Sequence, residues 1–201
     1  MVKVKIIRHS ERLDYKYPLY WILCLGQYWD DAPLTSYGHQ LASAKGKQIS
    51  NCDFNPKNIY MSPYKRTMET STELKNHFPH CNLVFVPLLS EYQPRHKHSI
   101  NLYPNGIPTD FDGEETEFIF PENYEQFTKR IKYVVSKLME KNKEDFIAVT
   151  HGEVLKTYIN YLQEQYPHLL LDADAVPYLT TLSFEYNPDT QEINQESIKI
   201  D

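Results

Sequence analysis

Side chains that can bind an anion or transfer a proton follow each of the first four strands that the sequence predicts. In chain order they are Arg8 with His9, then Arg66, Glu91 and His151. Ligands of α/β sheets bind at the carboxyl ends of parallel strands, and these ends share one edge of the sheet. We therefore expect these residues to meet there, together with Arg12, as a site for an anion beside a nucleophile and an acid.

The arginines are suited to hold a phosphoryl group. The chain has five arginines against sixteen lysines, and three of the five, Arg8, Arg12 and Arg66, fall near predicted strand ends. A guanidinium binds two phosphate oxygens at once and neutralises their charge, which lysine does less specifically. A single arginine is usually part of a surface ion pair, but the three together predict a phosphate site.

The two histidines and one carboxylate supply the reactive groups. Like charge from the neighbouring arginines lowers the pKa of His9, so its imidazole is neutral at pH 7 and can form a phosphohistidine. A single histidine after a strand is usually structural, but His151 would add a second imidazole at the same phosphorus. Glu91 would protonate the leaving oxygen, although most loop glutamates are solvated. Glu11, Asp31 and the acidic cap loop are the other candidates for the acid.

Strands and helices alternate along the chain and position these residues. Strands are predicted at 2–7, 58–61, 83–86, 145–150, 178–186 and 192–200. Helices are predicted at 35–51 with Thr35 as N-cap, from Ser62 as N-cap to about residue 77, at 122–141 and at 153–165. This order predicts a three-layer α/β/α sandwich with a mostly parallel central sheet. Residues 92–120 lack periodicity and contain three prolines, so we expect a small cap inserted into one domain of residues 1–201.

Composition and charge narrow the class of protein. The chain has 201 residues, 41% hydrophobic and 24% charged, which is typical of one globular domain. A net charge of -6 argues against a nucleic-acid partner, and no apolar run is long enough to cross a membrane. Three cysteines without a CxxC pair argue against disulfides and zinc, and six glycines form no nucleotide-binding loop. We expect a cytoplasmic protein that uses neither a cofactor nor a metal.

The segment Arg8-His9-Ser10-Glu11-Arg12 resembles the R-H-G signature of the histidine phosphatase superfamily, which has the phosphoglycerate-mutase-like fold. The resemblance continues in the family's order through Asp31-x-Pro33-Leu34-Thr35-x-x-Gly38, Ser62-Pro63-x-x-Arg66 and His151-Gly152. It is strongest toward the phosphatase domain of suppressor-of-T-cell-receptor-signalling proteins and toward insect ecdysteroid-phosphate phosphatase. The roles it implies are His9 as nucleophile, Glu91 as acid, and a phosphate pocket of Arg8, Arg12, Arg66 and His151.

The resemblance implies a metal-independent phosphomonoesterase with a phosphohistidine intermediate. Phosphotyrosine, sugar phosphates and steroid phosphates all fit as substrates. The alternatives are a catalytically silent scaffold of the same fold and a phosphoglycerate-type mutase, although a mutase needs a basic cap and this cap is acidic. Ser10 replaces the usual glycine, and we expect it to narrow the pocket. The expected partner is a phosphorylated small molecule or phosphoprotein, and a homodimer stays possible.

Other patterns point to different chemistry. Asp172-Ala173-Asp174 imitates the nucleophile motif of haloacid-dehalogenase phosphatases, but too little chain follows it for that fold. No arginine lies six residues after a cysteine, which excludes a Cys-dependent tyrosine phosphatase. His96 and His98 lack the further ligands of a zinc site, and the acidic run at 110–117 predicts an exposed loop. We expect the aromatic residues at 15–29 to pack in the core or cap, or to wall a pocket for an apolar group.

Overall fold

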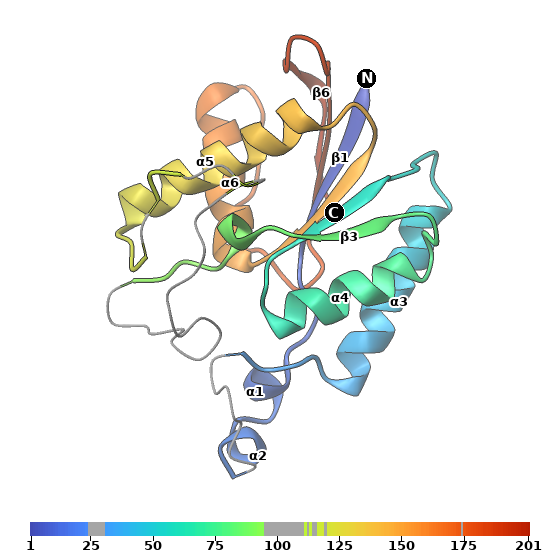
Figure 1. The fold of residues 1–201 in the computed structure, drawn as a ribbon, viewed down its shortest axis with the longest axis vertical. Coiled ribbons are helices and arrows are strands. Elements are labelled where there is room, and N and C mark those ends of the chain that lie inside the picture. Colours follow the sequence, from blue (N-terminus) through green and yellow to red (C-terminus); the bar gives the residue numbers. More distant parts are fainter. Residues whose placement is uncertain (24–30, 95–110, 112, 114–115, 119, 174) are drawn as a thin grey trace.

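The computed structural model describes residues 1–23, 31–94, 111, 113, 116–118, 120–173 and 175–201. Its centre is a six-stranded sheet in the order β3-β2-β4-β1-β5-β6 (Figure 1). The strands are β1 (Val2–Arg8), β2 (Asn58–Met61), β3 (Asn82–Phe85), β4 (Phe146–Thr150), β5 (Thr181–Tyr186) and β6 (Ile193–Ile200). The first four are parallel, whereas β5 runs antiparallel to β1 and to β6. The predicted, mostly parallel sheet is confirmed.

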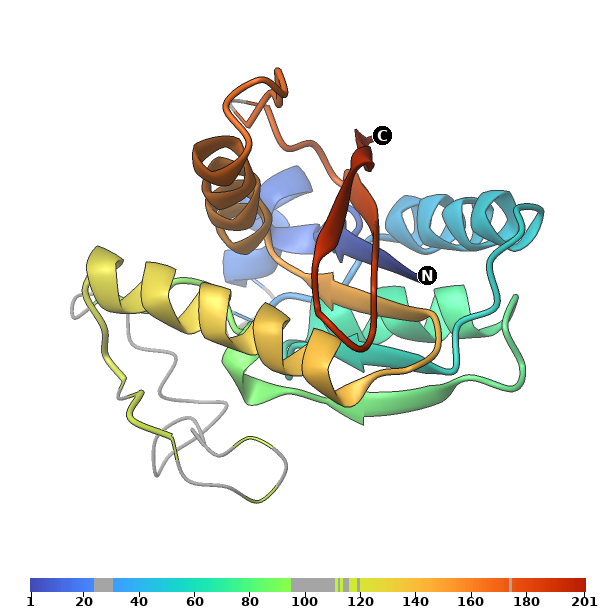
Figure 2. The same ribbon diagram turned by 90° about the horizontal axis from the view of Figure 1, so that it is seen from above.

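Helices cover both faces of this sheet (Figure 2). The helices on one face are α3 (Ser36–Ser50) and α4 (Lys65–Lys75), and those on the other are α5 (Tyr124–Lys141) and α6 (Gly152–Gln165). Strand β4 is buried throughout because its side chains alternate between two cores. Phe146 and Ala148 pack with α5 and α6, while Ile147 and Val149 pack with α3 and α4. A continuous apolar run suits a strand covered on both faces, and the three-layer α/β/α sandwich is confirmed.

The parallel strands end at one level, which brings the segments after them to one edge of the sheet. Strand β4 pairs with β1 on one side and with β2 on the other. Beyond the strands, the His9 N–H donates to the Thr150 carbonyl at 2.9 Å and the Ser62 N–H donates to the Val149 carbonyl at 3.1 Å. His9, Ser62 and His151 therefore leave the sheet side by side.

Helix α4 begins at Lys65, later than predicted, and the expectation that Ser62 caps it is wrong. The Ser62 hydroxyl instead lies 2.8 Å from His151 Nε2. The start of the helix meets Asp31, whose Oδ1 accepts a hydrogen bond from the Lys65 N–H at 2.7 Å. A side chain from another segment thus satisfies one of the open N–H groups at the start of the helix.

The predicted N-cap of α3 is confirmed, since Thr35 Oγ1 accepts a hydrogen bond from the Gly38 N–H at 2.8 Å. The same turn is fixed to the chain after β1, because the Thr35 N–H donates to the Glu11 carbonyl at 3.0 Å. A Cβ atom on Gly38 would lie 2.4 Å from that carbonyl oxygen, so only glycine allows the close approach. This contact holds the backbone next to Arg12 against α3.

Three short elements are not foreseen from the sequence: α1 (Leu13–Lys16), α2 (Pro18–Leu23) and the 3-10 turn η1 (Pro87–Leu89). Each is too short for a periodic pattern to reveal it. Within the predicted cap at 92–120, residues 95–110, 112, 114–115 and 119 lie outside the described residues, and the others belong to no helix or strand. Among the described helices, none is both long and apolar enough to span a membrane.

Candidate active site

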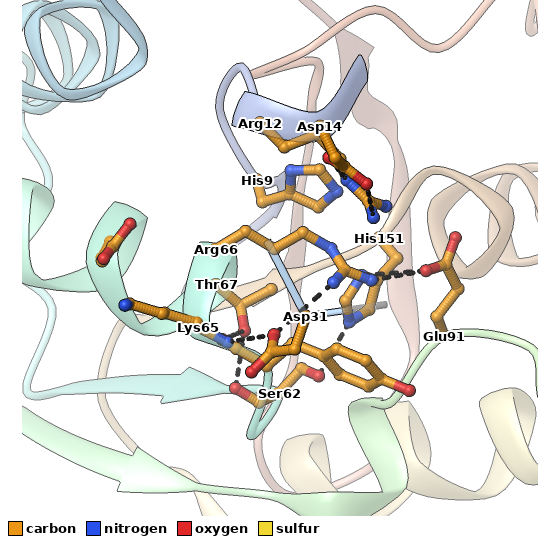
Figure 3. Close-up of polar contacts among 12 residues, drawn as sticks. His9, Arg12, Asp14, Asp31, Ser62, Lys65, Arg66, Thr67, Glu91 and His151 are labelled. Carbon is orange, nitrogen blue, oxygen red and sulfur yellow. Dashed lines mark hydrogen bonds and ion pairs between the residues drawn. The ribbon is translucent and has the colours of Figure 1, made fainter. Parts of the chain in front are cut away.

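A cavity of about 310 Å³ opens at the carboxyl edge of the sheet, a volume that suits a small ligand. It is lined by Arg8, His9, Arg12, Tyr15, Glu91, Gly152, Glu153, Lys156 and Val176. Arg66 and His151 lie behind this lining, 1% and 0% exposed, and both contact Glu91 (Figure 3). The structure therefore brings together all six residues that the sequence predicts for the site.

His9 has one ring nitrogen engaged by its own backbone neighbour. The side chain is 3% exposed, and Nδ1 lies 2.8 Å from the Ser10 carbonyl oxygen. A carbonyl only accepts hydrogen bonds, so Nδ1 must carry the proton. Nε2 is consequently the nitrogen with the lone pair, and it is the atom of His9 that can act as a nucleophile.

The environment of His9 keeps its imidazole neutral. Burial is the largest cause and lowers the pKa of His9 well below its ordinary value of 6.5. The positive charge of Arg66, and then of Arg8 and Arg12, lowers the pKa further, while the hydrogen bond to Ser10 opposes this. The sequence predicts the direction from the arginines alone, and the structure adds desolvation as the main cause.

His151 is the second buried imidazole, with its ring centroid 5.4 Å from that of His9. Its Nδ1 lies 3.8 Å from Glu91 Oε2 and has no hydrogen-bond partner among the described residues. Burial, followed by the charge of Arg66, lowers the pKa of His151 well below 6.5. The unsatisfied Nδ1 is a polar atom that a ligand oxygen could engage.

Arg66 is fixed by two carboxylates and an aromatic ring. Its Nη2 donates to Glu91 Oε2 at 2.5 Å, and its Nη1 lies 3.7 Å from Asp31 Oδ1. The guanidinium also stacks on the Tyr64 ring at 4.3 Å. Glu91 lines the cavity and Arg66 does not, so the carboxylate lies between the cavity and this buried cation.

Arg8 crosses the start of α6 to reach the cavity. Its Nη1 donates to the Val176 carbonyl, and its guanidinium stacks on Tyr178 at 4.4 Å. Its buried Nε has no hydrogen-bond partner within the described ranges. A Cβ atom at Gly152 would lie 3.2 Å from that Nε, so the glycine leaves room for the arginine.

Arg12 is held by its near neighbours in sequence. Nε and Nη2 donate to the two carboxylate oxygens of Asp14 at 2.6 Å each, which is a bidentate ion pair. The Tyr15 ring lies 4.3 Å from the guanidinium carbon. Arg12 is thereby presented to the cavity in one orientation, beside Arg8.

The sequence pattern of the histidine phosphatase superfamily, branch 1, matches residues 6–198. This chain belongs to that superfamily. It is 57% identical over 201 residues to an uncharacterized phosphoglycerate mutase family protein of Acanthamoeba polyphaga mimivirus, covering 100% of this chain and 98% of the relative. The resemblance seen in the sequence is confirmed.

Solved structures share the fold of this histidine phosphatase superfamily member. The ecdysone phosphate phosphatase of Bombix mori, in complex with tungstate, matches with a TM-score of 0.69 at 19% identity, covering 99% of this chain and 94% of the other. A phosphoglycerate mutase of Bacillus anthracis matches with a TM-score of 0.65 at 18% identity, covering 98% and 92%. A phosphoserine phosphatase of Entamoeba histolytica matches with a TM-score of 0.63 at 20% identity, covering 99% and 97%. The phosphoglycerate-mutase-like fold is confirmed.

The expectation that Ser10 narrows the pocket of this superfamily member is wrong. Ser10 is fully buried and does not line the cavity. Its hydroxyl donates to the Gly38 carbonyl at 2.7 Å, and its N–H donates to Thr70 Oγ1 at 3.0 Å. The side chain therefore points toward α3 and fastens the segment after β1 to it.

Among the alternative acids, neither Glu11 nor Asp31 lines the cavity. Glu11 accepts a hydrogen bond from Thr35 at 2.8 Å, and Asp31 is occupied at the start of α4. Most of the acidic cap loop lies outside the described residues, and its Glu117 pairs with an exposed lysine. Glu91 is the carboxylate that the geometry favours as acid.

The structure of this superfamily member also bears on the remaining sequence patterns. No strand lies directly before Asp172, and Leu170 in the same segment is 98% exposed. Asp174 lies outside the described residues. His96 and His98 also lie outside them, and the described part contains no group of three potential metal ligands. Within the aromatic segment at 15–29, residues 24–30 are not described. The described tyrosines of that segment do not join the core: Tyr15 walls the cavity, while Tyr17 and Tyr20 are exposed.

Tyr178 is a site neighbour that the sequence analysis does not identify. Its ring centroid lies 5.7 Å from that of His9. It precedes β5, whose antiparallel pairing with β1 places the start of β5 at the carboxyl end of β1. Lys156, one turn after Gly152 on α6, is likewise missed. The helical spacing from Gly152 was the signal that could have found it.

Proposed function

We propose that this chain is a metal-independent phosphomonoesterase that acts through a phosphohistidine at His9. The observation that carries the proposal is the tautomer imposed by Ser10, which leaves the lone pair on Nε2 of a buried, neutral imidazole. A neutral imidazole is a nucleophile, and clustered guanidinium groups stabilise the charge of a phosphoryl group in transfer.

In the first step, His9 Nε2 attacks the phosphorus and the N–P bond forms as the ester P–O bond breaks. The arginines and His151 would bind the non-bridging oxygens, and Glu91 would give its proton to the leaving oxygen. A phosphoryl oxygen bound by Arg66 competes with the Glu91 carboxylate for the same guanidinium. Substrate binding thus releases the Glu91 carboxylate from Arg66. It then takes up a proton from solvent, and this is the proton that it gives to the leaving oxygen.

In the second step, water attacks the phosphorus while Glu91 takes a proton from the water. The N–P bond breaks, its electron pair returns to Nε2, and inorganic phosphate leaves. The burial and positive charge that lower the pKa of His9 also disfavour a cationic phosphorylated ring. The same environment that keeps the nucleophile neutral therefore favours its departure from phosphorus.

We favour an aromatic or apolar phosphomonoester, such as phosphotyrosine, as the substrate class. Tyr15 and Val176 line the cavity, and Tyr178 lies beside Arg8. These side chains offer apolar surface next to the phosphate-binding groups. Among the structural neighbours, one phosphatase is named for ecdysone phosphate and another for phosphoserine, so the shared fold is compatible with different leaving groups.

Two alternatives make different predictions. A scaffold of the same fold would not need a nucleophile, an acid and three arginines gathered at one edge of the sheet. A mutase would return the phosphoryl group to its substrate, which would then be isomerised without release of inorganic phosphate. Inorganic phosphate and isomerised phosphoglycerate, measured in the same reaction, distinguish hydrolysis from the mutase reaction.

Trapping the covalent intermediate tests the proposal. A radiolabelled phosphomonoester, quenched rapidly in alkali, should leave an acid-labile, base-stable label on the wild-type chain. His9→Ala should lose the label and on the order of 10³-fold in rate. His168→Ala, which removes an exposed histidine, should retain both. Label persisting in His9→Ala would overturn the assignment of the nucleophile.

A further inference from the structure

Arg130 and Glu122 form a buried ion pair that the proposed chemistry does not use. Arg130 on α5 is 0% exposed, and Glu122, just before that helix, is 3% exposed. Two hydrogen bonds join them, from Nε to Oε2 at 2.9 Å and from Nη2 to Oε1 at 2.5 Å. Because desolvation offsets the attraction, such a pair contributes little more stability than well-packed apolar side chains would. The pair therefore calls for an explanation other than stability.

The third nitrogen of Arg130 binds the loop that leads to Glu91. Nη1 donates to the carbonyl oxygens of Leu88 and Ser90 at 2.5 and 3.1 Å. Between these two, the carbonyl oxygen of Leu89 accepts a hydrogen bond from Thr150 Oγ1 at 2.8 Å. Three consecutive carbonyl groups before Glu91 are thus held by side chains.

Glu122 binds the same loop on the other side of Glu91. Its N–H donates to the Gln93 carbonyl at 2.9 Å, and its Oε1 accepts a hydrogen bond from the Gln93 N–H at 3.4 Å. The Gln93 side chain donates to the Tyr64 hydroxyl at 2.5 Å. Tyr64 is the residue whose ring stacks on Arg66, so the contacts lead back to the site.

The backbone is fixed on both sides of Glu91, while its side chain is 26% exposed and lines the cavity. We propose that Arg130 and Glu122 are positioning residues for the general acid: they fix residues 88–93 and thereby hold Glu91 within reach of the leaving oxygen. The inference rests on the proposed function, in which Glu91 is the acid.

The energetic reason is the short range of proton transfer. A general acid must lie within hydrogen-bond distance of the oxygen that it protonates, and a displacement of 1 Å can cost on the order of 10²-fold in rate. Glu91 is on a loop rather than in a helix or strand. A loop holds such a distance only when other groups bind its backbone, as Arg130 and Glu122 do.

The double variant Arg130→Met/Glu122→Leu tests the inference without leaving one buried charge unpaired. It should slow hydrolysis of an alkyl phosphate on the order of 10²-fold and that of p-nitrophenyl phosphate much less, since p-nitrophenolate leaves without a proton. The control Tyr186→Phe removes buried hydrogen bonds to Met139 and Asn142 at the other end of α5. This control should not slow hydrolysis of the alkyl phosphate more than that of p-nitrophenyl phosphate.

Adding Glu91→Gln identifies the route of the effect. In the Glu91→Gln chain, the double variant should cause no further loss of rate on the alkyl phosphate relative to p-nitrophenyl phosphate. The effects of substitutions that act through one group are not additive. A selective loss that persists, or equal losses on both substrates from the double variant, would overturn the inference. If Glu91→Gln alone slows both substrates equally, the assigned acid fails instead, so the two failures are distinguishable.

Hydrogen exchange gives a readout that does not depend on turnover. The amides of residues 89–93, followed by mass spectrometry of the intact chain, should exchange faster in Arg130→Met/Glu122→Leu than in wild type and in Tyr186→Phe. Unchanged exchange at residues 89–93 would show that the ion pair does not hold this loop in place. That result would overturn the inference even if the chain hydrolysed no phosphomonoester.

Discussion

The Ser62 hydroxyl lies 2.8 Å from Nε2 of His151, where it can hold the ring in the tautomer that carries its proton on the other nitrogen. A hydroxyl is able to donate, so Nε2 can accept and leave the proton on Nδ1. Nδ1 is the atom without a hydrogen-bond partner among the described residues, on the side of Glu91. With this assignment His151 offers a donor to a phosphoryl oxygen, whereas His9, protonated on the backbone side, offers a lone pair.

Ser62→Ala should therefore weaken catalysis although Ser62 does not line the cavity. Without the hydroxyl, the proton can move to Nε2 and Nδ1 loses its role as donor. We expect kcat/KM to fall about tenfold, the value of one hydrogen bond to a charged group. Ser71→Ala is a matched control, since this buried serine of α4 has a hydroxyl without a partner in the described ranges. Equal rates for the two variants would contradict the tautomer assignment.

Glu91→Gln should slow alkyl phosphates far more than p-nitrophenyl phosphate. An alcohol of high pKa needs a proton to leave, and general acid catalysis contributes roughly 10²–10⁴-fold where protonation matters. The dependence of kcat/KM on leaving-group pKa, measured over a series of phosphomonoesters, should steepen in the variant. Glu153→Gln, which changes another carboxylate of the cavity lining, should leave that dependence unaltered. Parallel losses on every substrate would assign Glu91 a role in shaping the pocket only.

The free energy of unfolding should fall as the pH is lowered from about 6.5. The pKa values of His9 and His151 are lowered in the folded chain, first by burial and then by Arg66. Above 6.5 neither state binds these protons; below it the unfolded chain takes them up first, which stabilises the unfolded state. Each histidine should contribute a slope of up to about 1.4 kcal/mol per pH unit. Denaturant titrations of His9→Gln should show a shallower slope, and an unchanged slope would contradict the buried, neutral state.

Removal of divalent metal ions should leave turnover unchanged. The charge of a bound phosphoryl group would be neutralised by Arg8 and Arg12, which line the cavity, and by Arg66, which lies behind Glu91. The measurement is the rate of release of inorganic phosphate before and after dialysis against EDTA. A loss of activity that magnesium restores would contradict the metal-independent mechanism.

The fold could be predicted from the sequence because its signals are local. Strand β4 is a continuous apolar run, the N-cap at Thr35 is three residues from its partner, and the motifs after the strands follow the family's order. Polar contacts between distant segments could not be predicted in this way. Ser62 carries the signature of an N-cap, yet its hydroxyl is bound by an imidazole 89 positions away.

The contacts of Arg130 could not be predicted from the sequence for the same reason. Its partners in the loop are backbone carbonyl groups 40 and 42 positions away. Every residue has a backbone carbonyl, so the residue types at these positions do not indicate the contact. The amphipathic pattern predicts the helix around Arg130 correctly, but assigns this buried position no function. Buried arginines that bind a loop's backbone become visible only when the tertiary structure is known.

The ion pair between Arg66 and Glu91 also bears on how the product leaves. Inorganic phosphate is an anion like the monoester from which it came, so a pocket of guanidinium groups would bind the product as well as the substrate. In the proposed reaction, each phosphate that leaves Arg66 would be replaced by the Glu91 carboxylate, which lies 2.5 Å from Nη2. In the proposed reaction this competing carboxylate would lower the affinity for inorganic phosphate without removing any positive charge, and release of the product would be faster.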